Sequence, residues 1–215
     1  MDEPEPMDAP DRADAYAATD FSEVNEAFVA RLLELAGDRK NARAIDLGTG
    51  PGDVPLLVAK LRPHWNIVAT DASLPMLRHG HDSARANVSN VRFVLADVKR
   101  LPIPDASFDI VFSNSLLHHL PDPTPFWREI RRIAKPGALV FVRDLTRPPS
   151  PRDAQRLVDT YAANGHPLLR EDFYNSFLAA FTPAEIEEQA HTLGMEEMIV
   201  EQVTDRHMDI RSTPV

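Results

Sequence analysis

The stretch AIDLGTGPGDVP, residues 44–55, places three glycines within five positions, directly after a short apolar run. Glycine readily adopts the left-handed backbone of a tight turn, and it lets a ligand approach the main chain closely. A glycine-rich turn between a strand and a helix is typical of nucleotide-binding sheets. The stretch therefore predicts an α/β fold with a ligand site at the turn.

Short apolar runs alternate with helical segments on both sides of this turn. The predicted strands are apolar nearly throughout, as buried parallel strands are, and lie at residues 43–47, 66–70, 91–95, 108–113 and 138–145. The predicted helices between and after them lie at residues 54–61, 74–86, 125–134 and 151–163. This alternation predicts an open, doubly wound parallel sheet with helices on both faces.

Several helix starts are marked by capping residues. Apolar residues at helical spacing in 21–35 predict an amphipathic helix before the first strand, with Ser22 as its N-cap and its end near Gly37. Thr124 and Ser150 each precede a proline, and this pattern predicts two further N-caps.

The two ends of the chain differ from the alternating middle. Residues 1–15 are acidic and proline-rich, which predicts a disordered tail before a single domain at 16–215. Residues 164–181 are aromatic-rich and predict a helical flap. A capping box formed by Thr182 and Glu185 predicts a helix after the flap. Two short strands in 195–211 then predict an antiparallel C-terminal hairpin, which gives about seven strands in all.

Composition limits the class of partner. The chain has 215 residues, a formal net charge of -10 and no cysteine. The acidic charge argues against nucleic acid or an anionic membrane surface and favours a small-molecule partner. The lack of cysteine excludes disulfides and thiolate zinc sites and is consistent with a cytoplasmic protein. No apolar run approaches the roughly 18 residues of a membrane span.

The spacing of the glycines narrows the classes of ligand that the turn could bind. A phosphate-binding P-loop needs lysine after its last glycine, but Asp53 follows Gly52. A dinucleotide fingerprint needs its third glycine three positions after the second, whereas Gly48, Gly50 and Gly52 are spaced two and two. A carboxylate at that place would repel a pyrophosphate, so NAD is disfavoured. The alternative that the glycines serve only the geometry of the turn, without any ligand, stays open at this point.

The segment DLGTGPG, residues 46–52, resembles the first motif of class I S-adenosylmethionine-dependent methyltransferases. The resemblance extends over roughly residues 40–146 and is strongest to the small-molecule group that includes the quinone-biosynthesis enzymes. It implies a Rossmann-like methyltransferase fold, S-adenosyl-L-methionine as cofactor, S-adenosyl-L-homocysteine as product and a small-molecule methyl acceptor.

Acidic residues at three successive strand ends fit this resemblance. Asp46 would meet the ammonium group, Asp71 the ribose hydroxyls, and Asp97 with the Val98 amide the adenine ring. An aspartate at a strand end can also be a helix cap or a turn residue. The other cofactor contacts that the resemblance implies are Tyr16, Gly48, Thr49, Gly50, Ala72, Met76 and Asn114.

Candidates for catalysis and acceptor binding come from later strand ends and from the flap. His118 and Asp144 are the predicted catalytic residues, with His118 as a base or polar contact; a packing role for this histidine is the alternative. No metal is predicted, because adjacent histidines face different ways and no ligand cluster accompanies them. The predicted substrate-binding residues are Arg147, Tyr161, Tyr174 and Asn175.

Three functions follow from these patterns. The first is methyl transfer by in-line attack of a substrate nucleophile on the sulfonium methyl. The second is a non-catalytic protein or subunit that binds S-adenosylmethionine and acts as a regulator. The third is an NAD-dependent oxidoreductase, which the glycine spacing disfavours.

Overall fold

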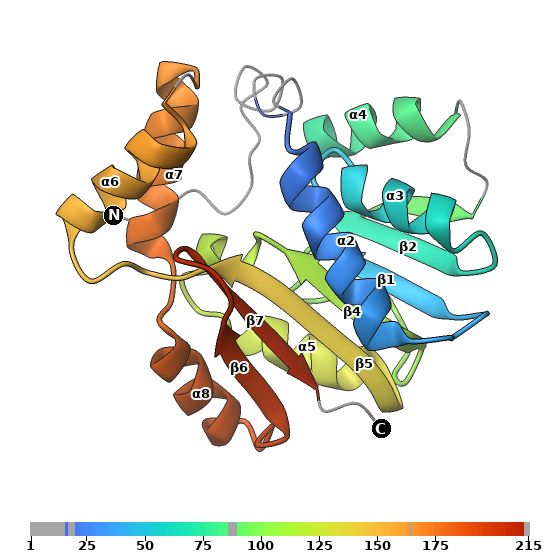
Figure 1. Ribbon diagram of the computed structural model, residues 1–215. Helices are drawn as coiled ribbons and strands as arrows, with labels where there is room; N and C mark the ends of the chain where they lie inside the picture. Colours follow the sequence, from blue (N-terminus) through green and yellow to red (C-terminus); the bar gives the residue numbers. More distant parts are fainter. Residues whose placement is uncertain (1–15, 17–19, 86–89, 164, 213–215) are drawn as a thin grey trace.

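The computed structural model describes residues 16, 20–85, 90–163 and 165–212 (Figure 1). The predicted tail at 1–15 lies outside the described residues. The described strands form one sheet in the order β3-β2-β1-β4-β5-β7-β6. They are β1 (Arg43–Leu47), β2 (Asn66–Asp71), β3 (Val91–Leu95), β4 (Phe108–Asn114), β5 (Ala134–Leu145), β6 (Met198–Gln202) and β7 (His207–Ser212).

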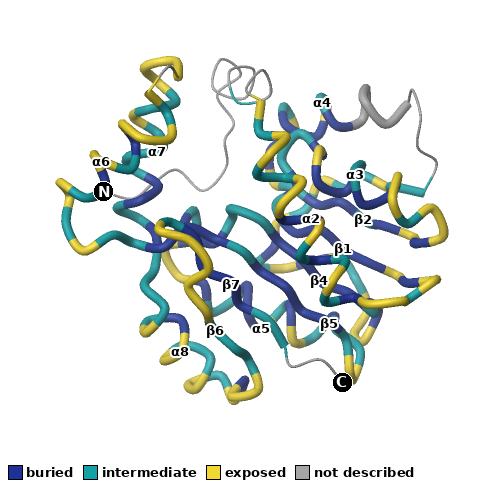
Figure 2. The backbone as a smooth tube through the Cα atoms, in the orientation of Figure 1, coloured by how far each residue is buried: buried dark blue, intermediate teal, exposed yellow. Residues whose placement is uncertain are grey.

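Strand directions match the prediction of a mostly parallel sheet. The first five strands pair in parallel, while β7 runs antiparallel to both β5 and β6. Four of the five β1 residues are buried, and Figure 2 shows that burial is concentrated along the sheet. The seven-stranded open sheet with a C-terminal antiparallel hairpin is therefore confirmed.

Helices cover both faces of the sheet. On one face α2 (Ser22–Ala36) and α3 (Asp53–Leu61) pack against β1, β4 and β5. On the other face α5 (Thr124–Ile133) and α8 (Pro183–Thr192) pack around a second core. The remaining helix along the sheet is α4 (Leu74–Arg85), which contacts β2 and β3. In the described part of the chain, every helix is too short or too polar to cross a bilayer.

The predicted flap is one half of a helical hairpin. In Figure 1, α6 (Pro151–Tyr161) and α7 (Pro167–Ala179) project beyond the end of β5. The hairpin leaves and re-enters the sheet at neighbouring points, because Thr146 forms a parallel bridge with Phe181 and the Arg147 N–H donates to the Phe181 carbonyl at 3.0 Å. We call this junction the stalk.

Two predicted N-caps are wrong. Ser22 and Thr124 are the first helical residues of α2 and α5, and neither precedes its helix. In each case an aspartate two residues upstream accepts a hydrogen bond from their backbone N–H. The acceptors are Asp20 Oδ1 and Asp122 Oδ1, both at 2.9 Å. Because the upstream carboxylate takes this N–H, each helix begins one residue earlier than the Ser or Thr pattern predicts.

The other two capping predictions are confirmed. The Ser150 hydroxyl accepts a hydrogen bond from the Asp153 N–H at 3.2 Å, which starts α6. Thr182 and Glu185 form the reciprocal capping box at the start of α8. Both caps lie close to the stalk, so they fix where the hairpin ends and the sheet layer resumes.

Candidate functional site

The glycine turn at the end of β1 is held by its two neighbouring strands. The N–H groups of Gly48 and Thr49 both donate to the Thr70 carbonyl of β2, at 2.8 and 2.9 Å. On the other side, the buried Ser113 hydroxyl of β4 donates to the Leu47 carbonyl at 2.7 Å. These bonds satisfy the backbone where the sheet ends, and they fix the direction in which the turn leaves it.

Two of the glycines are required for different reasons. Gly48 has φ +73°, and a Cβ at this position would lie 2.7 Å from the Leu116 side chain. Gly50 has φ +56°, with no atom within 4 Å of the place where a Cβ would lie. Gly48 therefore permits close packing below the turn, whereas Gly50 leaves room for a ligand beside the backbone.

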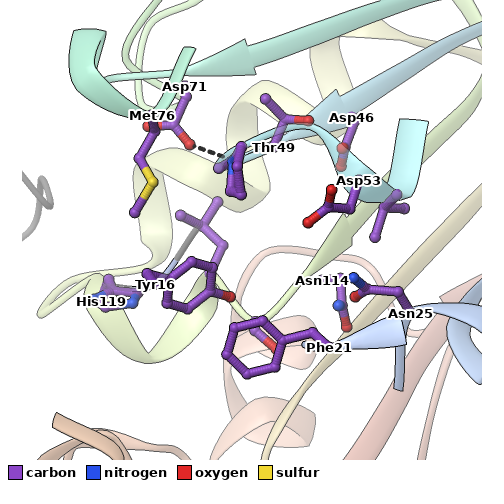
Figure 3. Close-up of a pocket in the computed structure, with 16 residues that line it drawn as sticks. Tyr16, Phe21, Asn25, Asp46, Thr49, Asp53, Asp71, Met76, Asn114 and His119 are labelled. Atoms are coloured by element: carbon purple, nitrogen blue, oxygen red, sulfur yellow. Dashed lines mark hydrogen bonds between the residues drawn. The ribbon is translucent and has the colours of Figure 1, made fainter. Parts of the chain in front are cut away.

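Asp71, at the end of β2, ties the turn to the next loop. Its Oδ2 accepts a hydrogen bond from the Gly50 N–H at 2.8 Å, shown as the dashed line in Figure 3, and its Oδ1 accepts one from the Ser73 N–H at 2.8 Å. Each carboxylate oxygen has a second lone pair. Asp71 can thus organise the loops and still accept hydrogen bonds from a ligand.

A cavity opens at this turn and brings together eight of the predicted site residues (Figure 3). The predicted cofactor residues that line it are Tyr16, Asp46, Gly48, Thr49, Gly50, Asp71, Met76 and Asn114. The lining residues that were not among the predicted site residues are Phe21, Asn25, Pro51, Asp53, Val54, Ser115, Leu116 and His119. Phe21 and Asn25 carry no motif, since only the packing of α2 brings them to the cavity.

Buried acceptor atoms face this cavity. Asp46 is 1% exposed, and its Oδ2 has no hydrogen-bond partner among the described residues. Asn114 Oδ1 is also buried and also has no hydrogen-bond partner among the described residues. Burial raises the pKa of Asp46 to about 7; the Thr49 hydroxyl, a nearby hydrogen-bond donor, opposes this rise, and the nearby charge of Asp71 adds to it. Because buried acceptors without donors are costly, the pair fits a ligand that supplies N–H groups, and an ammonium group does so.

Aromatic side chains form another wall of the cavity. The ring centroids of Tyr16 and Phe21 lie 4.7 Å apart. Burial, and then the charges of Asp53 and Asp71, raise the pKa of Tyr16 to about 12. The phenol therefore stays protonated at neutral pH, so Tyr16 offers a hydroxyl donor and an apolar ring to whatever occupies the cavity.

The predicted catalytic pair forms a buried contact. His118 Nδ1 lies 2.7 Å from Asp144 Oδ1, and the Asp144 carboxylate also accepts hydrogen bonds from the N–H groups of Leu117 at 2.5 Å and Leu145 at 2.7 Å. Burial opposes ionisation of Asp144, but His118 and the backbone donors hold its pKa below the usual range. The pair joins β5 to the 3-10 helix η1 (Leu117–His119).

His119, the next residue, lines the cavity, whereas His118 does not. The two imidazole centroids are 4.3 Å apart. Burial and the neighbouring His118 lower the pKa of His119 to about 3, so its ring is neutral at physiological pH. His119 is not predicted as a site residue from the sequence. The contact between His118 and Asp144, which exists only in the folded chain, decides which of the two adjacent histidines faces the cavity.

Three predicted cofactor residues lie outside the cavity lining. Asp97 Oδ1 accepts a hydrogen bond from the Lys99 N–H at 2.9 Å, and Asp97 Oδ2 lies 3.6 Å from the Lys99 ammonium. Asp97 thus closes its own turn after β3. The roles assigned to Ala72, Asp97 and Val98 stay predictions.

The predicted substrate residues Arg147 and Tyr161 are engaged in contacts with neighbouring elements. Arg147 forms an ion pair with Glu185 of α8. The Tyr161 hydroxyl donates to Asp205 Oδ2 at 2.7 Å, and the Arg206 guanidinium lies 3.4 Å from the centroid of the Tyr161 ring. The contacts of Tyr161 hold α6 against the β6–β7 turn, and the ion pair of Arg147 holds the stalk against α8. Neither Arg147 nor Tyr161 lines the cavity.

The other two predicted substrate residues lie on α7, outside the same lining. Tyr174 packs in the small apolar cluster formed by β5, α6 and α7, and Asn175 is half-buried. Because α7 packs against η1, both lie on the element next to His118 and His119. Their part in acceptor binding stays a prediction.

Comparisons with known proteins point to methyltransferases. Residues 45–142 match the family model described as a methyltransferase domain. The chain is 32% identical over 139 residues to the ubiquinone/menaquinone biosynthesis C-methyltransferase UbiE of Ectopseudomonas mendocina, covering 63% of this chain and 54% of that protein. It is 34% identical over 128 residues to the demethylmenaquinone methyltransferase of Thermus thermophilus, covering 60% and 57%. The chain thus spans about half the length of the curated relatives it matches.

Solved structures agree with the fold. A SAM-dependent methyltransferase from Aquifex aeolicus superposes with a TM-score of 0.72 at 18% identity, covering 96% of this chain and 99% of the other. The plantazolicin methyltransferase BpumL, solved with SAH, superposes with a TM-score of 0.72 at 14% identity, covering 96% and 92%. At these identities the likeness shows the arrangement of strands and helices.

Proposed function

We propose that this protein transfers a methyl group from S-adenosylmethionine to a small molecule, starting from the match of residues 45–142 to the family model described as a methyltransferase domain. One observation carries the proposal: Asp46 Oδ2 and Asn114 Oδ1 are buried without a hydrogen-bond partner among the described residues, and both side chains line a cavity at the glycine turn. A glycine turn alone fits several nucleotides, whereas unpartnered acceptor oxygens at its base favour a ligand with an ammonium group.

The cofactor would be held by residues from three strand ends. Asp46 and Asn114 would receive the amino group, and Asp71 would accept hydrogen bonds from the ribose hydroxyls. Gly50 would allow the ligand to approach the backbone, since no atom lies within 4 Å of its missing Cβ. Asp97 and the Val98 amide are retained as proposed contacts of the adenine ring.

Bound S-adenosylmethionine supplies a methyl group on a sulfonium, an electrophile that needs no further activation. In the proposed transfer, the acceptor atom would bond to the methyl carbon as the carbon–sulfur bond breaks, the electron pair of that bond would remain on sulfur, and the proton lost by the acceptor would pass to solvent. The protein mainly has to align the acceptor and exclude water. The rings of Tyr16 and Phe21 can exclude water, and the neutral imidazole of His119 can accept a hydrogen bond from the acceptor.

We assign a positioning role to the predicted catalytic pair of His118 and Asp144. Their contact holds η1 against the end of β5, and η1 carries His119 to the cavity. The pair therefore acts through the residue that it positions. The names of the relatives, which refer to ubiquinone and menaquinone biosynthesis, make a hydroquinone ring the first acceptor to test.

Calorimetry with S-adenosylhomocysteine tests the proposal. We expect Asp71→Ala to weaken binding by roughly 1.5–3 kcal/mol, because hydrogen bonds to a charged acceptor are lost. Asp38→Ala is the matched control, since Asp38 is an exposed aspartate outside the cavity lining. Unchanged affinity in folded Asp71→Ala protein would contradict the ribose assignment. Binding without turnover across a broad acceptor screen would favour the non-catalytic alternative.

A further inference from the structure

The two C-terminal strands are covered by helices on one side of the sheet. The side chains that these strands pack into the core shared with α5 and α8 belong to Met198, Val200, Met208 and Ile210. On the other side, α2 covers β4 and β5, and none of the described helices lies over β6 and β7 (Figure 1). Because side chains alternate along a strand, the residues between these four point to the uncovered side.

We call this uncovered side the β6–β7 face. It carries Ile199 and Glu201 of β6, and Asp209 and Arg211 of β7. Cross-strand pairing sets Ile199 opposite Arg211, and Glu201 opposite Asp209. The four residues therefore form a square, in which Arg211 and Glu201 occupy one diagonal and Ile199 and Asp209 occupy the other.

Asp209 is fully buried and already neutralised within the chain. The Arg143 guanidinium of β5 donates to both of its carboxylate oxygens, at 2.6 and 2.9 Å. Arg31 Nε of α2 lies 3.7 Å from Asp209 Oδ2, and the Arg143 guanidinium lies over the Phe28 ring of α2. These contacts anchor α2 beside the β6–β7 face, and they leave the charge of Asp209 balanced.

The two residues on the other diagonal are not balanced in this way. Arg211 Nε is buried, and it has no hydrogen-bond acceptor among the described residues. The Glu201 carboxylate is exposed and forms no ion pair with the part of the chain that the structure describes. Because a buried donor without an acceptor is costly, Arg211 fits a partner that brings a carboxylate. Glu201 fits a partner that brings a cation.

We propose that the β6–β7 face is a contact between two copies of this chain. A two-fold contact is self-complementary, so the group that the surface lacks has to be present on the same surface. A two-fold axis along the diagonal through Ile199 and Asp209 sets Arg211 opposite Glu201 of the partner subunit, and it does so twice. The two Ile199 side chains then meet beside these ion pairs. An unrelated partner would need the same two charges at the same spacing, whereas a second copy has them by symmetry.

The rest of the molecule permits this contact. The net charge of -10 opposes the approach of two copies, but exposed charges farther apart than about 8 Å are largely screened at physiological salt. The ion pairs formed in the contact therefore decide its strength. Since β6 is the last strand of the described sheet, no further described strand obstructs a second copy. The proposal does not depend on the proposed methyltransferase function.

Analytical ultracentrifugation of the full chain tests the proposal. We expect a monomer–dimer equilibrium in the micromolar range. Arg211→Glu sets two glutamates against each other in each contact, and Glu201→Arg sets two arginines against each other, so each variant should raise the dimer Kd at least about tenfold. A parent protein that stays monomeric at about 100 μM, well above the Kd of a specific contact, overturns the proposal. A dimer that either variant leaves intact overturns it as well.

A mixture of the two variants distinguishes charge pairing from damage to the fold. When one copy carries Arg211→Glu and the other carries Glu201→Arg, each contact again joins an arginine to a glutamate. The mixture should therefore dimerise with a Kd within about threefold of the parent value, although each variant alone does not. Variants that fail to associate when mixed, while their thermal unfolding is like that of the parent protein, contradict the proposal.

Glu187→Arg is the matched control. It makes the same change of charge at an exposed glutamate of α8, the helix that covers the opposite side of the sheet. The dimer Kd of this variant should equal that of the parent protein. An equally large loss of dimer in Glu187→Arg and Glu201→Arg would show that overall charge, and not the β6–β7 face, controls association.

Discussion

The glycine turn and the α6–α7 hairpin are held in place in different ways. At the turn, backbone groups of β1 bond to β2 and β4, as in the contacts of Gly48 and Thr49 with the Thr70 carbonyl. At the hairpin, exposed or half-buried side chains bond to one another, as Tyr161 does with Asp205. The turn is thus fixed by the sheet itself, whereas the hairpin is held by the backbone contacts of the stalk, by a small buried apolar cluster and by side-chain contacts near the surface.

This difference has a consequence for binding. At the turn, Asp46 and Asn114 keep buried acceptor atoms without donors among the described residues, which the ammonium group of the proposed cofactor would supply. Within the hairpin, Arg156 pairs with Asp153 and Arg170 with Asp159. We therefore expect changes at the turn to alter cofactor affinity, and changes at the hairpin to alter stability or acceptor turnover alone.

Gly48→Ala should have the largest effect. The new Cβ would lie 2.7 Å from Leu116, at a φ of +73° that alanine rarely adopts. We expect a loss of roughly 2–3 kcal/mol in unfolding free energy and a loss of S-adenosylhomocysteine affinity of about 100-fold or more. Chemical denaturation and calorimetry measure both.

Gly37→Ala is the matched control, because Gly37 has φ +59° but no neighbour within 4 Å of its absent Cβ and no place in the cavity lining. It should lose about 1 kcal/mol of stability from backbone strain and keep its affinity. If both variants lose the same affinity for S-adenosylhomocysteine, the position of Gly48 in the cavity lining is not the cause of the loss.

Cofactor affinity should depend on pH through Asp46, whose pKa is about 7. An ammonium group binds the ionised carboxylate, so protonation of Asp46 competes with binding. From pH 8 to pH 6 we expect S-adenosylhomocysteine affinity to fall about tenfold, as a single competing proton requires. In Asp46→Asn the affinity should be low throughout and should lose this dependence. A pH-independent affinity in the parent protein would rule out Asp46 as the ammonium partner.

The same residue should affect stability in the opposite direction. Its folded pKa lies above the unfolded value of about 3.9, so the folded protein holds a proton that the unfolded chain releases between pH 4 and 7. Stability from this group therefore falls as pH rises through that window. Asp46→Asn should be more stable than the parent protein at pH 8, by about 1–3 kcal/mol, as measured by urea unfolding.

At the hairpin, Ser150→Ala removes the hydroxyl that caps α6. We expect about 1 kcal/mol lower stability, the usual effect of losing an N-cap side chain, with unchanged affinity for S-adenosylhomocysteine. A marked loss of affinity in this variant would show that the hairpin and the turn are coupled.

Tyr161→Phe should have the smallest effect. It removes the hydroxyl that bonds to Asp205 and keeps the ring beneath the Arg206 guanidinium. Since Tyr161 is 44% exposed, the stability loss should be below about 1 kcal/mol, again with unchanged cofactor affinity. Differential scanning calorimetry and titration with S-adenosylhomocysteine measure the two quantities.

The regions also differ in how far the sequence predicts them. Asp46 and Asp71 were found because parallel strands end at one edge, so their order along the chain gives their place in space. The caps at Ser22 and Thr124 were wrong, because an aspartate two residues upstream accepts the N–H of each of them, and each is already the first residue of its helix. A capping pattern therefore predicts the start of a helix reliably only where no neighbouring side chain offers another hydrogen-bond acceptor.

The choice between the two histidines needed tertiary information. Nothing in the pair His118–His119 indicates which ring faces the cavity; the carboxylate of Asp144, 26 positions away along the chain, decides it. The contacts of Phe21 and Tyr161 likewise depend on how distant elements pack. Side chains that meet only through such packing leave no spacing in the sequence to be recognised.

Because of the stalk, the hairpin is an insertion that another pair of helices could replace. Because Thr146 and Phe181 are bridge partners, the intervening helices enter and leave at nearly one place, and another helical pair could be spliced between them without shifting the register of any strand. The glycine turn and the strand ends around it would then keep their backbone contacts, because none of them passes through the hairpin.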